Sequence, residues 1–412
     1  MPAASGLFKQ VAYKVESTFG VAPTQASAQA LRRVQSTLDL SKDTYQSNEL
    51  RPDLQIADYR HGVRKVAGKI SGELSCKTYA DFMAAGLKRA FTAGVSAATV
   101  SLTIAGAGPT YTVTRAAGSY LTDGFKVGTV IRLSVGALNA ANLNKNLMIT
   151  ALTATVATVI VLNAVALVAE GPITGCTVTT VGKRTYIPTS GHTDLSFAVE
   201  HWYSDLSQSE LFLGCKMDKI SMNLPPTGMA TVDFDFMGQD VADVASKRGA
   251  VALNTQYFTT PTAVTTTATM AAVNGVIRIG GVAVASLTGL SIEIDPTYSG
   301  DPVVGSNIVP QLFAGKVAVT GQFTAYFDST TLRDAFFAES EIDLMAAFTS
   351  DNSAAADFIC IAIPRLKLGG SSKNDGDGGL VQTIPFQALL NINGGTGLAT
   401  EATTLQIQDA QA

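Results

Sequence analysis

The sequence feature that most constrains the fold is a short pattern that occurs twice. Ile70–Ser75 (ISGELS) returns as Val319–Thr324 (VTGQFT), and all six pairs are identical or alike in size and polarity. Around each copy the sequence predicts a strand, a long loop, the glycine-centred strand and then a helix. In the first copy these are a strand over 31–40, a loop over 42–66 and a helix over 78–91. In the second they are a strand over 287–295, a loop over 296–314 and a helix over 329–340, with Ser329 as its N-cap. We therefore expect two homologous units.

Three further strands are expected after each helix. Asp194-Leu195 corresponds to Asp343-Leu344, Met217–Leu224 to Ile359–Leu368, and Thr231–Phe234 to Thr383–Phe386. The predicted fold class is mainly β (α+β), with two duplicated domains that each carry a flanking helix. The first domain is expected to be discontinuous, over 1–93 and 184–249, and the second to cover 250–412.

The segment 94–183 differs from its surroundings and predicts a small all-β module inserted into the first domain. It carries seven charged residues, and its short β-like runs are separated by Gly, Asn and Pro. Residues 146–169 are uncharged, but they hold several threonines and are dense in Val and Ile. A membrane-spanning helix would be richer in Leu and poorer in polar residues, so two buried strands with a turn are expected.

Charge and cysteine usage narrow the classes of function. Lys and Arg number 29 and Asp and Glu 33, so the net charge is −4, which disfavours tight binding of nucleic acid through its phosphates. Charged residues make up 15% of the chain, against about 25% in an average domain. The four cysteines stand far apart, which predicts reduced, buried thiols made in a cytoplasm. The first ten residues do not resemble a signal peptide.

Signals for catalysis, cofactors or metals are weak. His61, His192 and His201 form no metal-binding cluster and are predicted to be solvated loop residues. Asp375 and Asp377 lie in a glycine-rich stretch that fails the pattern of a calcium loop, so a hairpin tip is favoured. Asp233 and Asp235 alternate with phenylalanines and predict the polar face of a strand rather than an acid–base pair. The sequence therefore predicts no enzyme, no cofactor and no metal site.

The loop at 42–66 is the best candidate for a functional surface. Positive and negative residues alternate along it, which suits a contact between identical subunits because one loop can offer both partners. The alternative is a solvated loop without a special role. The residues expected to make this contact are Lys42, Asp43, Glu49, Arg51, Asp53, Asp58, Arg60, Arg64 and Lys65.

With these residues in view, the chain resembles the major tail tube proteins of long-tailed bacteriophages, the non-contractile (siphophage) type in particular. The resemblance rests on the N-terminal third, by the order and spacing of Tyr13–Pro23, Ser47–Arg51, Asp58–Gly62 and Gly68–Leu74. The later part matches in its strand–loop–strand–helix order, and the segment 94–183 lies outside the shared pattern.

The resemblance implies β-sandwich domains assembled into rings, which stack as a hollow tube around a channel through which DNA passes without specific binding. It implies that the loop at 42–66 reaches the neighbouring ring. Because such rings commonly have sixfold character, a chain with two tube domains predicts a homotrimer with pseudo-sixfold symmetry, and a hexamer is the alternative. The expected partners are further copies of the chain and other tail proteins, with no membrane. The expected location is the virion tail, assembled in the host cytoplasm, with the insert on the outer wall. A tail terminator, a baseplate component, or a hydrolase with a β-sandwich accessory domain are the other hypotheses.

Overall fold

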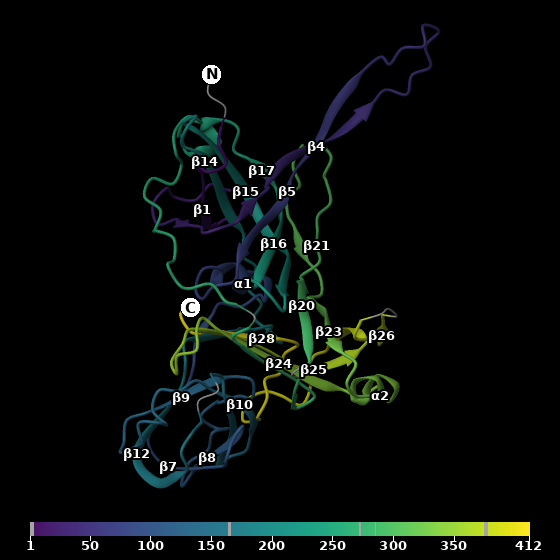
Figure 1. Ribbon diagram of the computed structural model, residues 1–412. Coiled ribbons are helices and arrows are strands. Elements are labelled where there is room, and N and C mark those ends of the chain that lie inside the picture. Colours follow the sequence, from purple (N-terminus) through teal and green to yellow (C-terminus); the bar gives the residue numbers. More distant parts are fainter. Residues whose placement is uncertain (1–3, 164–165, 272, 285, 375–377) are drawn as a thin grey trace.

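The computed structural model describes residues 4–163, 166–271, 273–284, 286–374 and 378–412, and these form a mainly β protein with two short α-helices (Figure 1). The predicted fold class is confirmed. Twenty strands belong to one connected sheet system, and six more close into a separate barrel. The principal hydrophobic core runs through both halves of the chain.

Apart from the insert and its stem, the first half supplies nine strands, one α-helix and a 3₁₀ turn. They are β1 (Lys9–Val15), β2 (Gln29–Ala30), β3 (Gln35–Ser36), β4 (Asp39–Gln46), β5 (Tyr59–Glu73), α1 (Ala80–Gly86), β14 (Phe197–Tyr203), β15 (Gln208–Leu224), β16 (Thr231–Gly238), β17 (Asp240–Val241) and η1 (Ala245–Arg248). The single strand predicted over 31–40 is wrong, since β3 has two residues and the longer strand begins at Asp39.

The second half repeats this order after a long connection. Its elements are β18 (Gly275–Ile279), β19 (Val282–Ala283), β20 (Leu287–Asp295), β21 (Tyr298–Ser299), β22 (Phe313–Ala314), β23 (Ala318–Tyr326), α2 (Thr331–Phe337), β24 (Ile342–Thr349), β25 (Phe358–Leu368), β26 (Ser372–Lys373), β27 (Val381–Ala388) and β28 (Gln406–Asp409). The strand predicted over 287–295 has the bounds of β20.

The two halves pair their strands in the same order, always antiparallel. In the first half the order is β1–β14–β15–β16–β5–β3, and in the second it is β18–β24–β25–β27–β23–β20. The last strand also returns to the same neighbour, because β17 pairs with β15 and β28 pairs with β25. Such a long strand order, shared by both halves, is what duplication of one unit would produce.

The register of the two halves corrects the predicted correspondence of their final strands. The motif glycine Gly72 pairs with Val232, and its counterpart Gly321 pairs with Phe386. Val232 therefore corresponds to Phe386, which displaces the predicted match of 231–234 with 383–386 by two residues. A two-residue shift leaves every side chain on its own face of the sheet, so hydrophobic alternation alone does not detect it.

The glycine of the repeated motif is required by close packing in both halves. A Cβ on Gly72 would lie 1.7 Å from the hydroxyl oxygen of Tyr79. A Cβ on Gly321 would lie 2.3 Å from the carbonyl oxygen of Ser291 and 2.5 Å from the ring of Phe386. A side chain at either position would push an aromatic ring out of the core.

The two helices are shorter than predicted, and they end in the same way. Each has seven residues, and each is followed two residues later by a non-glycine residue in the left-handed region, Lys88 (φ 59°) and Glu339 (φ 50°). This backbone conformation stops a helix, so the predicted extensions to residues 91 and 340 are wrong. Ser329 is not the N-cap, because α2 follows Thr330.

The segment between α1 and β14 contains a closed barrel, at the lower end of Figure 1. Its elements are β7 (Ser96–Ala105), β8 (Thr110–Arg115), β9 (Val130–Ser134), β10 (Leu147–Leu152), β11 (Val156–Val161) and β12 (Glu170–Thr180), in the order β10–β11–β8–β7–β12–β9. The interpretation of 146–169 as two buried strands is confirmed by β10 and β11. No helix in the described residues is long and apolar enough to cross a membrane.

The barrel belongs in sequence to the first half but packs on the second. The stem strands β6 (Thr92–Ala93) and β13 (Lys183–Tyr186) pair with each other, and β13 pairs with β28. The Gln408 side chain bonds the backbone of Val130 in both directions, at 2.7 and 3.0 Å. An apolar layer joins Met148 of the barrel to Phe358 and Cys360 of β25. These contacts fix the barrel to the second half.

Candidate assembly surfaces

The strands β4 and β5 form a hairpin arm that projects from the body of the molecule, drawn in purple at the upper right of Figure 1. Their register runs from Asp39 opposite Ala67 to Gln46 opposite Tyr59. The prediction of an irregular loop over 42–66 is therefore wrong for most of its length, and residues 47–58 form the loop at the tip.

Most charges predicted to make an intersubunit contact are paired within the arm. Arg51 bonds Asp53 at 2.8 Å, Arg60 bonds Asp58 at 2.7 Å, and Lys65 bonds Asp43 at 3.1 Å. These pairs are exposed, and screening by solvent makes such pairs weak contributors to stability. Lys42 and Glu49 lie on the same arm and are both exposed. Each of these paired charges already has a partner in its own chain, so a contact with another molecule would compete with that pair.

Arg64 has a different setting from the other eight residues. Its guanidinium bonds Asp240 at 2.6 Å and Asp243 at 2.9 Å, and its side chain is 10% exposed. Burial raises the pKa of Asp243, but hydrogen bonds from Lys247 and Arg64 outweigh it and hold that pKa below its ordinary value. Arg64 thus anchors the base of the arm to β17 and exposes little of its side chain.

The arm also carries a set of exposed apolar side chains that the sequence reasoning missed. Five large residues are at least half exposed, and two of them are almost completely bare, with Leu50 at 101% and Leu54 at 95%. We call this set the arm apolar group: Tyr45, Leu50, Leu54, Ile56 and Tyr59. The sequence does contain an indication of this group, because large apolar residues interrupt the charged segment and a solvated loop has no need of them.

The second half has a shorter hairpin in the corresponding place. Beyond β20 and β23 it continues as β21 and β22, with a loop over 300–312. This loop lies along the base of the arm, where the Arg64 amide donates to the Asn307 carbonyl at 2.8 Å. Val63, Tyr298, Val309 and Leu312 form a small apolar cluster beneath it. The two hairpins therefore stand as one unit on the same side of the molecule.

A polar cluster around the exposed carboxylate of Asp194 fixes the second hairpin to the first half through two buried lysines. The carboxylate of Asp194 accepts from Lys88 at 3.1 Å, from Lys216 and from the hydroxyl of Tyr298. Lys216 also donates to the Leu312 carbonyl at 2.8 Å. Both lysines are nearly inaccessible, and burial lowers the pKa of Lys88. Removing Asp194 would leave two buried cations without their shared carboxylate, which is costly.

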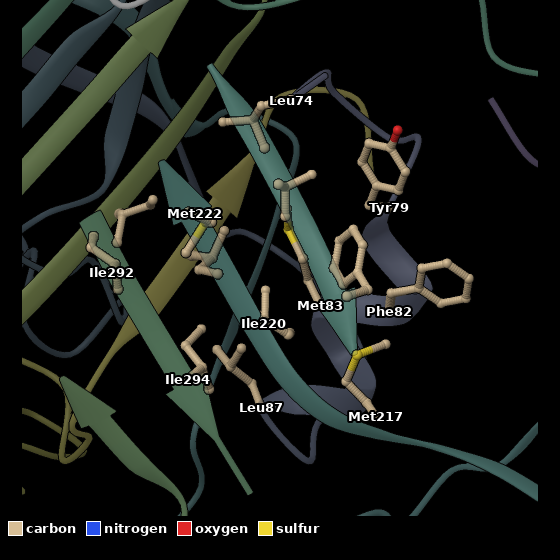
Figure 2. Packing of buried hydrophobic residues seen from close by; sticks show 14 of the residues in the cluster. Leu74, Tyr79, Phe82, Met83, Leu87, Met217, Ile220, Met222, Ile292 and Ile294 are labelled. Carbon is tan, nitrogen blue, oxygen red and sulfur yellow. The ribbon is translucent and has the colours of Figure 1, made fainter. Parts of the chain in front are cut away.

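The two halves meet in a strand junction where β15 pairs with β20. Ile220 lies opposite Ile294, Ser221 opposite Glu293 and Met222 opposite Ile292. The apolar members of these pairs lie side by side in Figure 2 and are completely or almost completely buried. We call this the internal junction, and it makes the sheets of the two halves continuous.

Two sheet edges that correspond to this junction have no strand partner in the described residues. β3 pairs with β5 alone, whereas its counterpart β20 pairs on both sides. β24 pairs with β25 as far as Leu366. On that same side of β25, the described residues supply no strand partner for Lys367–Gly370. Val34, beside β3, is 70% exposed. Unpaired edges of this kind are sites for strand addition.

The residues singled out for catalysis or metal binding can now be placed in the described part of the chain. Among the residues that the structure describes, no three His, Cys, Asp or Glu side chains are placed to hold a metal ion. Phe234 and Phe236 are buried while Asp233 and Asp235 are half-exposed, so the predicted two-faced strand is confirmed. All four cysteines are free and buried, as predicted. Asp375 and Asp377 lie outside the described residues.

His201 is a correction to the sequence interpretation. It lies in β14 and is completely buried, where its Nε2 and the Ser36 hydroxyl form a 2.8 Å hydrogen bond. Burial, with the nearby Lys9 and Arg33, lowers the pKa of His201 to about 3. The residue is a neutral core histidine rather than a solvated one.

Comparison with known protein families decides what kind of protein this is. The family model described as "Phage tail tube protein" matches residues 9–388. The chain belongs to the phage tail tube protein family. It is therefore a structural component of a phage tail and of the virion, and the family is structural rather than enzymatic.

The other comparisons add no functional information. No curated protein matches this tail tube protein. One solved structure, described as "Phage phi92 endosialidase", is 9% identical to it with a TM-score of 0.16, over 80% of this chain and 53% of that one. The tail tube protein thus spans about half the length of that structure, and a likeness this low carries no argument about fold or activity.

Proposed function

We propose that this tail tube protein forms homo-oligomeric rings that stack into a hollow tube through which DNA passes. The observation that carries the proposal is the internal junction, in which the two halves of one chain extend a single sheet. A subunit that has joined two similar units side by side can join further copies by the same geometry. A closed cycle of such contacts is a ring with no free sheet edge.

The proposed ring is a trimer with pseudo-sixfold symmetry. The common strand order of the two halves supports a division into a first unit (1–93 and 184–249), an inserted module (94–183) and a second unit (250–412). Three chains then place six similar units around the axis. The competing assembly is a homohexamer, in which each chain occupies one of six positions.

The arm is the proposed contact between stacked rings. It extends well away from the body and carries the arm apolar group beside the paired charges (Figure 1). Burying large apolar side chains supplies about 1.5–3 kcal/mol each, against about 0–1 kcal/mol for an exposed ion pair. We therefore assign most of the stacking energy to the apolar side chains, and orientation and register to the charges.

The remaining features fit a tube of the non-contractile type, assembled in the host cytoplasm and joined at its ends by other tail proteins. The net charge of −4 suits a channel that does not retain DNA, because a basic lining would slow its passage. The barrel over 96–180, packed on the second half, is proposed to lie on the outer wall, where its bulk leaves the channel open. No cofactor and no membrane has a part in this function.

Electron microscopy of the purified protein over a concentration series tests the proposal. Rings or hollow tubes with a central channel are expected, with a repeat that matches one ring. Particles that stay monomeric at every concentration, and that do not add to seeds of sheared tails, would contradict it.

A tail terminator or a baseplate component is the alternative within the same family setting. Copy number separates these functions, because a tube subunit recurs along the whole tail whereas a terminator occurs in one ring. Quantitative mass spectrometry of purified virions should place this chain among the most abundant structural proteins. A copy number of three or six per particle would favour the terminator.

A further inference from the structure

The internal junction defines which residues would meet when a second copy of the chain is added. In the first half, Ser221 pairs with Asp233, which pairs with the motif residue Ser71. In the second half, Lys367 pairs with Gln387, which pairs with the motif residue Thr320. Ser71 and Thr320 hold the same place in the repeat, so Ser221 and Lys367 are equivalent positions.

The other side of the junction is matched in the same way. Glu293 pairs with Thr320, and Gln35 pairs with Ser71. Glu293 and Gln35 are therefore equivalent. Ser221 and Glu293 are direct partners in the internal junction. Repeating that geometry between chains places Lys367 of one copy opposite Gln35 of the next.

The exposures of the side chains next to Glu293 and Gln35 agree with this assignment. Ile292, one residue before Glu293, is completely buried by the internal junction, whereas Val34, one residue before Gln35, is 70% exposed. An apolar side chain has thus been left bare at the position where its internal counterpart is covered. The Ser36 carbonyl accepts a hydrogen bond from Lys9 Nζ at 2.9 Å. Its donor is therefore a side chain and not the backbone of a neighbouring strand.

We propose that Leu366–Gly370 of one subunit pairs antiparallel with Arg32–Ser36 of a second copy, in the register of the internal junction. Leu366 then lies opposite Ser36, Lys367 opposite Gln35 and Leu368 opposite Val34. The partner is a second copy of this chain because the edge and its complement both occur on one molecule. This inference rests on the proposed ring. It names the strands, the register and the residues by which neighbouring subunits would close that ring.

Disulfide cross-linking tests the register. Opposed residues in an antiparallel pair have Cβ atoms about 4.5–5.5 Å apart, close to what a disulfide needs after a small adjustment. Gln35→Cys and Lys367→Cys are made as separate variants and mixed under oxidation, so that a bond between them joins two chains. All native cysteines are buried, which keeps the background low. The control replaces Lys367→Cys with Ser372→Cys, an exposed position five residues further along the same edge.

A reducible dimer in the first mixture and its absence in the control are expected. The double variant should give covalent species that end at the closed ring. Rings that form normally but stay uncross-linked at this pair would overturn the register and leave the proposed function standing. Absence of rings from the unmodified protein would instead overturn the proposed function, and the register with it.

A second variant keeps the test independent of disulfide geometry. Val34→Asp places a charge on a side chain that is bare in the single chain, so the folded monomer should keep its melting temperature. Ring formation should fall at least 10-fold, because the charge would face Leu368 in the paired edge. Val21→Asp, at a position 55% exposed, is the matched control and should assemble as the unmodified protein does. Unchanged assembly of Val34→Asp would contradict the proposal.

Discussion

Removing the apolar side chains at the tip of the arm should abolish stacking while leaving the fold intact. The perturbation is the triple substitution Leu50→Ser, Leu54→Ser and Ile56→Ser. These side chains are 101%, 95% and 67% exposed in the single chain. Full burial would supply about 1.5–3 kcal/mol for each. Allowing for partial burial in the stack, the triple variant should lose about 3–5 kcal/mol per arm, or roughly 10²–10³-fold or more in critical concentration.

Sedimentation at a series of concentrations measures this loss directly. The comparison variant reverses the charges of Arg51 and Arg60 with glutamate, which removes two exposed, solvent-screened ion pairs and adds repulsion. It should also be folded, with weaker stacking whose defect grows as the salt concentration falls. The apolar variant should show little dependence on salt, because no charge is changed.

The melting temperature of the monomer is the control for both variants. It should stay within about a degree or two, since exposed substitutions usually change stability by less than about 0.5 kcal/mol. A triple variant that polymerises at the critical concentration of the unmodified protein would refute the assignment of stacking energy to the arm apolar group. Loss of stacking in the charge-reversal variant alone would transfer that role to the charges.

Three further predictions concern stability. Gly72→Ala should lower the free energy of unfolding by about 2–4 kcal/mol, because its Cβ displaces Tyr79. Gly369→Ala should change it little in a calorimetric comparison, because its Cβ would meet Pro385 at an ordinary contact distance of 3.6 Å. The unfolded chain protonates His201 near pH 6.5, and the folded chain resists protonation until about pH 3, so stability falls as the pH drops through this window. At pH 4.5 the loss from His201 should be about 3 kcal/mol, and His201→Gln should show a flatter pH dependence in denaturant titrations. Deleting 94–183 should expose the apolar face of β24 and β25 and give insoluble protein; a soluble, cooperatively folded deletion would show that the barrel is dispensable.

The repeat could be predicted from the sequence because close packing requires a glycine at the same place in both halves. Only glycine fits beneath Tyr79 in one half and beside Phe386 in the other, so the motif keeps its glycine while its neighbours vary in detail. The outer limits of the helices could not be predicted, because they depend on Lys88 and Glu339 adopting a backbone conformation rare for such residues. The final strands were matched two residues out of register, since alternation is unchanged by an even shift.

The charge pattern is enough to locate the arm at 42–66 as a candidate contact surface. Which of its residues are buried and which are exposed depends on tertiary structure. Arg64 reads as one more loop cation until Asp240 and Asp243 are brought against it from β17 and the residues that follow. The apolar residues of the arm were visible in the sequence, but their exposure follows from the hairpin leaving the body. The edges at Val34 and Lys367 carry no local signature, because they are defined by what the corresponding strands of the other half do.

The number of chains in an isolated ring distinguishes the proposed trimer from a hexamer. Native mass spectrometry of rings, released from tubes or captured by the cross-link at positions 35 and 367, measures it without assumptions about shape. Three chains are expected, each of which contributes two similar units joined by the internal junction. Six chains per ring would rule out the trimer, because the second half would then not hold a place in the ring equivalent to the first.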